Sequence, residues 1–147
     1  SEAIRREPAF AGAWYNRALT YAEMKDYYPA IRDLSKCIEL HPNELRFWME
    51  RARLNAELLD YTKAEEEYSE MIRLFQYVPQ LFFYRAQLRI QQEKFPEALS
   101  DYDQAVTLFP DYAEAYRFRG AAHQHLKNME AALADFHKAA DLNSRSA

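Results

Sequence analysis

The sequence is poor in residues that turn a chain sharply, with only two glycines and six prolines among 147 residues. A sheet protein needs such residues at its hairpins, whereas alanine, leucine, glutamate, arginine and lysine favour helices. These helix formers are abundant here, and 49% of the residues are apolar, enough for a folded core. The composition therefore predicts a globular, all-helical protein.

The sequence also has little cysteine, no long apolar run and only a small excess of one charge. Cys37 is the single cysteine and cannot form a disulfide within the chain. No apolar run approaches the roughly 20 residues of a membrane-spanning helix, and the first ten residues do not resemble a signal peptide. The net charge of -4 comes from interspersed acids and bases without a basic stripe. We therefore expect a soluble, cytoplasmic chain with no membrane insertion and no nucleic acid partner.

The chain repeats itself with a period of 34 residues. Four segments align without a gap, at 11–44, 45–78, 79–112 and 113–146, and residues 1–10 match the end of a preceding repeat. If the places of each segment are numbered from 1 to 34, place 4 is always a large aromatic, place 8 is small, place 20 is alanine and place 30 is leucine. Such a period indicates stacked supersecondary units. Places 4, 8 and 20 are Trp14, Ala18 and Ala30, then Trp48, Ala52 and Ala64, then Phe82, Ala86 and Ala98, then Tyr116, Gly120 and Ala132.

The spacing within each segment predicts two antiparallel helices. Places 4, 8 and 11 share one helical face, and so do places 20, 24 and 27. Small residues at places 8 and 20 allow the two helices to approach closely, and each hairpin leaves a flank that the next one covers, which gives a solenoid. We expect Asp26, Asp60 and Asn128, at place 16, to cap the second helices. Pro42 and Pro110 are expected to stop the helices before them. Pro79 is expected to do the same between the second and third repeats, at a slightly later place.

The pattern of an aromatic at place 4, a small residue at 8, alanine at 20, an aromatic at 24 and proline at 32 resembles the tetratricopeptide repeat over nearly the whole chain. The resemblance implies an all-α, right-handed superhelical solenoid of antiparallel helix pairs. Two departures stand out. The family's tyrosine at place 11 is present only as Tyr21 and is replaced by Asn55, Arg89 and His123, and its leucine at place 7 is arginine in every repeat.

Place 23 is acidic in every repeat, just as place 7 is arginine. A hairpin that turns near place 15 puts places 7 and 23 at a similar height, so we predict a structural ladder of ion pairs, within one repeat or between neighbours. The alternative is a ligand site in which four stacked guanidinium groups bind a run of carboxylates or phosphates. The ladder residues are Arg17 with Asp33, Arg51 with Glu67, Arg85 with Asp101, and Arg119 with Asp135.

The resemblance also implies a concave groove, lined by the first helices, that receives a peptide or a helix of a partner protein. Places 2, 5, 6, 9, 12 and 13 face this groove in such folds. The family's clamp for a terminal carboxylate needs lysine, asparagine and arginine at particular places, and this sequence lacks them. Some candidates, Tyr84 and Met49 especially, have the alternative of packing against the neighbouring hairpin. The groove candidates are Tyr15, Asn16, Met49, Glu50, Arg53, Phe83, Tyr84, Gln87 and Arg117, a set of aromatics and arginines typical of binding hot spots.

We find no residues arranged for catalysis, a metal or a cofactor. His123 and His125 are two residues apart and so point about 200 degrees away from each other around a helix. There is no glycine-rich phosphate loop, and Cys37 occupies place 27, a small buried position in this pattern. The sequence therefore predicts a protein-interaction scaffold and not an enzyme.

The last repeat ends without a polar capping helix over Leu133 and Phe136. We therefore expect a fragment of a longer array. The alternative function is a structural module that forms homo-oligomers through its uncapped terminal helices.

Overall fold

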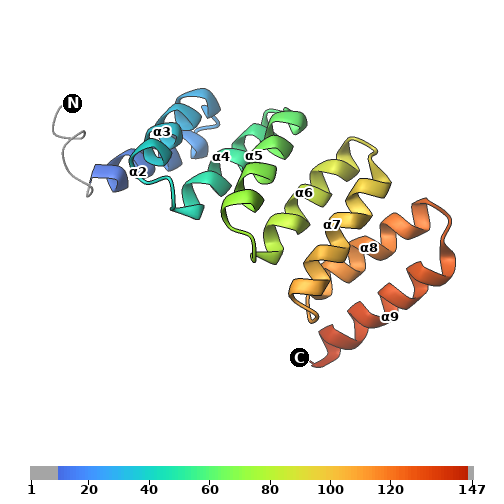
Figure 1. Ribbon diagram of the computed structural model, residues 1–147. Coiled ribbons are helices and arrows are strands. Elements are labelled where there is room, and N and C mark those ends of the chain that lie inside the picture. The colour runs from blue at the N-terminus through green and yellow to red at the C-terminus, as the bar shows by residue number, and fades with distance from the viewer. Residues whose placement is uncertain (1–9, 146–147) are drawn as a thin grey trace. The chain divides into compact units, whose positions relative to one another are not determined.

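The computed structural model describes residues 10–145, and every regular element within them is an α-helix (Figure 1). The helices pack as sequential antiparallel pairs, which confirms the all-α prediction. Most first helices cover places 1–13 of their repeat, and most second helices cover places 17–30. In chain order the elements are α2 (Phe10–Glu23), α3 (Tyr27–Leu40), α4 (Leu45–Glu57), α5 (Tyr61–Leu74), α6 (Pro79–Gln91), α7 (Phe95–Leu108), α8 (Ala113–His125) and α9 (Met129–Arg145).

The chain divides into two compact units, Ser1–Leu74 and Phe75–Ala147. The first contains α2 to α5, with α3 packed on α4 between its two hairpins, and the second contains α6 to α9, with α7 packed on α8. Residues 1–9, which the sequence assigns to the end of a preceding repeat, lie outside the described residues, as do residues 146 and 147.

Small residues bring the two helices of each hairpin together. The alanines at places 8 and 20 are buried in every repeat that has them. At place 8 of the last repeat, a Cβ atom added to Gly120 would lie 2.9 Å from the ring of Phe136 and 3.2 Å from the carbonyl oxygen of Ala132. The first and second helices therefore approach as closely as the sequence pattern predicts.

Every hairpin turns through a residue with positive φ at place 15. The next residue then donates its backbone N–H to a carbonyl five residues earlier, as from Asp26 to Tyr21 at 2.8 Å and from Asp60 to Asn55 at 3.0 Å, which is the Schellman closure of a helix. The sequence did not reveal this conformation, because glycine usually marks it and none is present at these turns. The four residues and their φ angles are Lys25 (61°), Leu59 (62°), Glu93 (60°) and Lys127 (66°).

Two predictions about helix ends need correction. Asp60 does cap α5, accepting the backbone N–H of Lys63 at 3.3 Å, but the side chain of Asp26 makes no capping hydrogen bond. The backbone of Asp26, at φ -96° and ψ 75°, departs from the extended conformation usual for a capping residue. Pro79 is the first residue of α6, whereas α5 ends earlier, at Leu74. Its fixed φ suits the first turn of a helix, where no N–H is needed.

Candidate functional site

The arginine at place 7 of each repeat donates hydrogen bonds to the acidic residue at place 23 of the same repeat. The pairing is two-pronged in three repeats, and the fourth pair, Arg51 with Glu67, is held through Nε. The acidic residues are all buried, and Asp33 is fully so. The distances for the three forked pairs are 2.7 and 2.8 Å between Arg17 and Asp33, 2.9 and 2.7 Å between Arg85 and Asp101, and 2.9 and 2.7 Å between Arg119 and Asp135.

Some arginines of the ladder also reach the preceding hairpin of their own unit. Arg51 donates to the hydroxyl of Ser35 at 3.0 Å, and Arg119 donates to a carboxylate oxygen of Asp103 at 2.9 Å. The hydrogen bond to Asp135 is the main cause that raises the pKa of the Arg119 guanidinium. Since the protein's own acceptors occupy these donors, the contacts favour a structural role for the ladder over a ligand site.

The aromatic residue at place 4 lies under the ladder arginine of its repeat. The guanidinium carbons lie 4.7 to 5.8 Å from the ring centroids, close enough for cation–π attraction. Two of these aromatics also form a hydrogen bond with the turn before their helix. Trp48 donates to the carbonyl of Pro42 and Tyr116 donates to that of Pro110, both at 2.9 Å. The sequence showed an aromatic residue at place 4 and an arginine at place 7 of every repeat, but not that the two side chains are in contact. The pairs are Arg17 over Trp14, Arg51 over Trp48, Arg85 over Phe82 and Arg119 over Tyr116.

The residues that replace tyrosine at place 11 face the buried acid of place 23. Asn55 donates to Glu67 at 2.9 Å, and Arg89 donates to Asp101 at 2.9 Å. His123 holds the same position, with Nε2 at 4.0 Å from an oxygen of Asp135. Asn55 and Arg89 thus donate hydrogen bonds to buried carboxylates and His123 lies near one, an arrangement that the sequence did not reveal.

Five of the nine groove candidates lie in the first unit. Tyr15 is half-buried against Phe47, with ring centroids 5.2 Å apart, and this burial is the main cause that raises the pKa of its phenol. Asn16 is exposed and Met49 is half-buried. Glu50 accepts a 2.8 Å hydrogen bond from Arg53, so these two charges neutralise each other.

The other four candidates lie in the second unit, and they differ in exposure. Phe83 is only 4% exposed, because it sits at the centre of an aromatic cluster, and its side chain is not available to a partner in this structure. Tyr84 is 38% exposed, Arg117 is exposed, and Gln87 is half-buried. The rings around Phe83, with centroid distances, are Tyr84 (5.6 Å), Tyr102 (6.0 Å), Tyr112 (5.2 Å) and Phe118 (5.7 Å).

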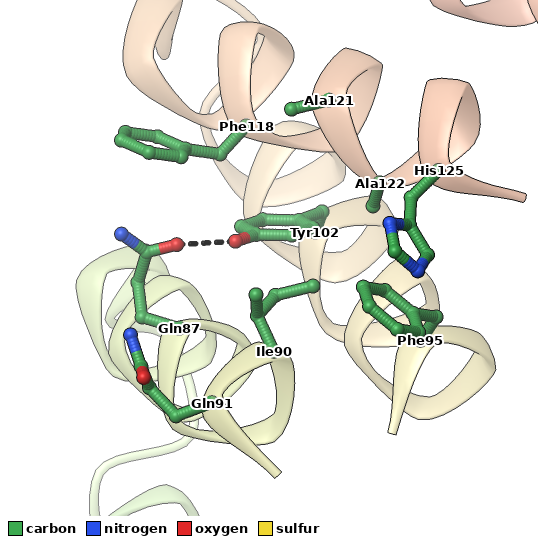
Figure 2. Close-up of a pocket in the computed structure, with 9 residues that line it drawn as sticks. All are labelled: Gln87, Ile90, Gln91, Phe95, Tyr102, Phe118, Ala121, Ala122 and His125. Atoms are coloured by element: carbon green, nitrogen blue, oxygen red, sulfur yellow. Dashed lines mark hydrogen bonds between the residues drawn. The ribbon is translucent and has the colours of Figure 1, made fainter. Parts of the chain in front are cut away.

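A pocket of about 340 Å³ opens in the second unit where α6, α7 and α8 meet (Figure 2). Four of the residues that line it carry polar groups: Gln87, Gln91, Tyr102 and His125. Most of its lining is formed by rings and small or aliphatic side chains, namely Ile90, Phe95, Tyr102, Phe118, Ala121 and Ala122.

Two contacts fix the side chains around this α6–α8 pocket. The Tyr102 hydroxyl donates to Oε1 of Gln87, as the dashed line in Figure 2 shows. Burial raises the pKa of Tyr102, so this phenol stays protonated as a donor. On the opposite side His125 stacks on Phe95, with ring centroids 4.0 Å apart and an interplanar angle of 19°.

Among the residues of the α6–α8 pocket, sequence reasoning named only Gln87 as a groove candidate. A signal for others was present, because Ile90, Gln91, Phe118 and His125 occupy places 12, 13, 6 and 13, which face the groove in the family. Phe95 and Tyr102, from α7, had no such signal, since their places, 17 and 24, are positions at which the helices of a hairpin pack together.

The described part of the chain shows no cluster for a metal ion, and its one cysteine is buried. Residues 10–145 contain no cluster of three histidine, cysteine or acidic side chains that could hold a metal ion. Cys37 is fully buried, and this burial raises the pKa of its thiol to about 11, which keeps it unreactive. Over the same residues, no helix is both long enough and apolar enough to cross a membrane.

Comparisons with known proteins give a family and a fold. Two family models described as tetratricopeptide repeat match the chain, over residues 11–44 and 85–147. Among curated proteins, none matches significantly.

Three solved structures illustrate the fold. A crystal structure of MamA has a TM-score of 0.85 and 16% identity, covering 99% of this chain and 85% of that one. MamA 41-end from Desulfovibrio magneticus RS-1 has a TM-score of 0.80 and 16% identity, covering 95% and 77%. A tetratricopeptide repeat protein from Parabacteroides merdae has a TM-score of 0.83 and 20% identity, covering 91% and 54%. Identities this low show a shared fold alone.

Proposed function

This chain is a tetratricopeptide repeat protein, and we propose that it is an interaction module that binds a segment of another protein on the faces of its first helices. Repeats of this family typically mediate protein–protein interactions and are generally non-catalytic. The observation that carries the proposal is the α6–α8 pocket, a mainly apolar hollow of about 340 Å³ with a few polar groups. Such hollows, of about 300 to 1,000 Å³, are where proteins bind ligands.

The surroundings of the pocket support binding of a polypeptide. Gln87, from place 9 of α6, supplies an amide at its wall, and Gln91 supplies a second one turn later. Amide side chains can pair with the N–H and C=O groups of an extended backbone. Tyr84 and Arg117, both exposed on the same two helices, are residue types that dominate binding energy in protein interfaces.

Selection of random displayed peptides on the immobilised protein tests the proposal. The variant Ala121→Trp fills the pocket, because Ala121 is an exposed residue of its lining. We expect peptides selected on the parent chain to lose at least about tenfold in affinity for this variant, which is the loss that removal of one anchor produces.

Ala134→Trp is the matched control, since it makes the same exchange in the same unit away from the pocket. Ala134 is exposed on α9 at place 22, where the other repeats hold the exposed residues Arg32, Glu66 and Ser100. The control should bind like the parent chain. Failure to select any binding peptide, or equal binding to Ala121→Trp, would contradict the proposal.

Self-association is the second candidate, and one surface favours it. Met129 and Leu133, on α9, are 58% and 57% exposed. Phe136, in contrast, is half-buried and packs against Gly120, so its replacement by a charge would disturb the hairpin and not report on an interface. Light scattering of the parent chain and of Leu133→Glu across a concentration series tests this candidate. A dimer that Leu133→Glu dissociates would support it, and a concentration-independent monomer would reject it.

A further inference from the structure

The charges around the α6–α8 pocket are unbalanced. None of the residues that line it is acidic. Nearby carboxylates on α7 are already bound, because Asp101 accepts hydrogen bonds from Arg85 and Arg89, and Asp103 accepts one from Arg119. The lining of the pocket therefore contributes no negative charge of its own.

Arg117 is a positive charge that contacts one of the rings of this pocket and has no ion-pair partner among the described residues. Its guanidinium carbon lies 4.8 Å from the centroid of Phe118, whose ring lines the pocket. Among residues 10–145 it forms no ion pair, although Glu114 lies one turn earlier on the same helix. A guanidinium that is exposed, held over a ring and left without a counter-ion is suited to bind a carboxylate.

The pocket itself suits one apolar side chain. Its volume is near the lower end for ligand hollows, and rings of Phe95, Tyr102 and Phe118 form much of its lining. Since Oε1 of Gln87 accepts the proton of Tyr102, the amide nitrogen of Gln87 remains as the donor for a backbone carbonyl. An extended chain advances about 3.3 Å per residue and its alternate side chains point to the same face, so the side chain two residues from the inserted one can reach the pocket edge.

We propose that the α6–α8 pocket binds an extended segment of a partner protein that inserts one aliphatic side chain and presents a carboxylate, two residues away, to Arg117. This inference rests on the proposed function and adds to it the chemistry of the partner. The carboxylate belongs to a side chain within the segment and pairs with a single arginine beside the α6–α8 pocket.

Three blocked heptapeptides test the inference, each acetylated and amidated so that no terminal charge contributes. Their residues 2, 4 and 6 are Asp-Leu-Asp, Lys-Leu-Lys and Asp-Gly-Asp, with glycine at the other four positions, so that the charged side chains share the face of the central residue. Each is titrated into the ¹⁵N-labelled chain while the amide resonances of α6, α7 and α8 are followed. We expect the Asp-Leu-Asp peptide to shift the resonances of the pocket residues saturably, with affinity at least about fivefold above that of either other peptide, as one ion pair or one buried side chain provides.

Two charge reversals complete the experiment. Arg117→Glu should remove the preference for the acidic peptide over the lysine peptide. Arg32→Glu is the control, because it reverses an exposed arginine on α3 in the first unit, and it should leave the preference unchanged.

The failure of this inference can be told apart from the failure of the proposed function. Equal binding of the Lys-Leu-Lys peptide, or an unchanged preference in Arg117→Glu, would overturn the role of the carboxylate. Equal binding of the Asp-Gly-Asp peptide would overturn the apolar anchor, and a lack of shifts at the pocket with all three peptides would overturn both parts. In each case, displayed peptides that bind the parent chain and lose affinity for Ala121→Trp would still support the broader function.

Discussion

His123 lies with its Nε2 atom 4.0 Å from an oxygen of the buried Asp135, while its Nδ1 atom is buried and makes no hydrogen bond with the described residues. Arg89 occupies the same place in the preceding repeat and donates to Asp101 at 2.9 Å. Place 11 therefore donates a hydrogen bond to the buried carboxylate in the third repeat but not in the fourth. The residues at this place can be exchanged between the two repeats to measure what the hydrogen bond contributes to stability.

His123→Arg should stabilise the second unit. The exchange removes a buried nitrogen without a partner and adds a charged donor for Asp135, so we expect the free energy of unfolding to rise by about 1 kcal/mol. Urea unfolding followed by circular dichroism measures the change. Arg89→His is the reciprocal variant and should lower the free energy of unfolding by a similar amount. A midpoint that does not move in either variant would show that the contacts at place 11 do not contribute to stability.

Gly120→Ala should destabilise the last hairpin, although alanine favours a helix by about 1 kcal/mol over glycine. The new Cβ atom would lie 2.9 Å from the Phe136 ring and 3.2 Å from the Ala132 carbonyl oxygen, so we expect a net loss of about 1 to 2 kcal/mol. Thermal unfolding measures this loss.

The first repeat indicates how that loss can be recovered. It combines Ala18 with Leu34 at the same two places, and each is 1% exposed. The double variant Gly120→Ala with Phe136→Leu should therefore be more stable than the sum of the two single variants predicts, by about 1 kcal/mol. Strict additivity in this cycle would mean that the two side chains do not compete for space.

Leu59→Gly should stabilise the first unit. Leu59 has φ 62°, a conformation that is unfavourable for residues with a Cβ atom, and it is 71% exposed, so little packing is lost on its removal. We expect a gain of about 0.5 to 1 kcal/mol, measured by urea unfolding. The neighbour Leu58 has φ -79° and is half-buried, so Leu58→Gly should instead lower stability. Equal effects of the two variants would contradict this interpretation.

Cys37 should make the first unit less stable as the solution becomes alkaline. Burial raises the pKa of its thiol from the ordinary value of 9.0 to about 11. Between these values the unfolded chain has lost the proton and the folded chain has kept it, so the free energy of unfolding falls as the pH rises, by about 2 to 3 kcal/mol in total.

The matched variant for this prediction is Cys37→Ala. It should show a shallower fall in stability than the parent chain between pH 9 and 11, in urea unfolding at a series of pH values. The parent thiol should also react with a disulfide reagent at neutral pH only as fast as the chain opens. Parallel pH profiles for the two chains would contradict the buried state of the thiol.

The sequence alone determined the helices, their pairing and the ladder columns. These features depend on contacts between residues close in the chain, and a period of 34 residues repeats them four times. The small residues at places 8 and 20 predicted that the two helices of a hairpin pack closely. Arginine at place 7 and an acid at place 23 of every repeat predicted that these side chains lie at the same height along the hairpin. Pairs such as Arg17 with Asp33 were therefore readable before the structure, except for the choice between pairing within a repeat and pairing between neighbours.

Only the tertiary structure decided which side chains of the first helices remain open to a partner. Phe83 and Gln87 lie on the same helix four residues apart, and both faced the expected groove. The first is buried by rings from α7 and α8, whereas the second lines the pocket. That difference arises because the neighbouring hairpin covers one part of the helical face and leaves the next part open. The spacing of residues along a helix does not show which part a neighbouring hairpin will cover.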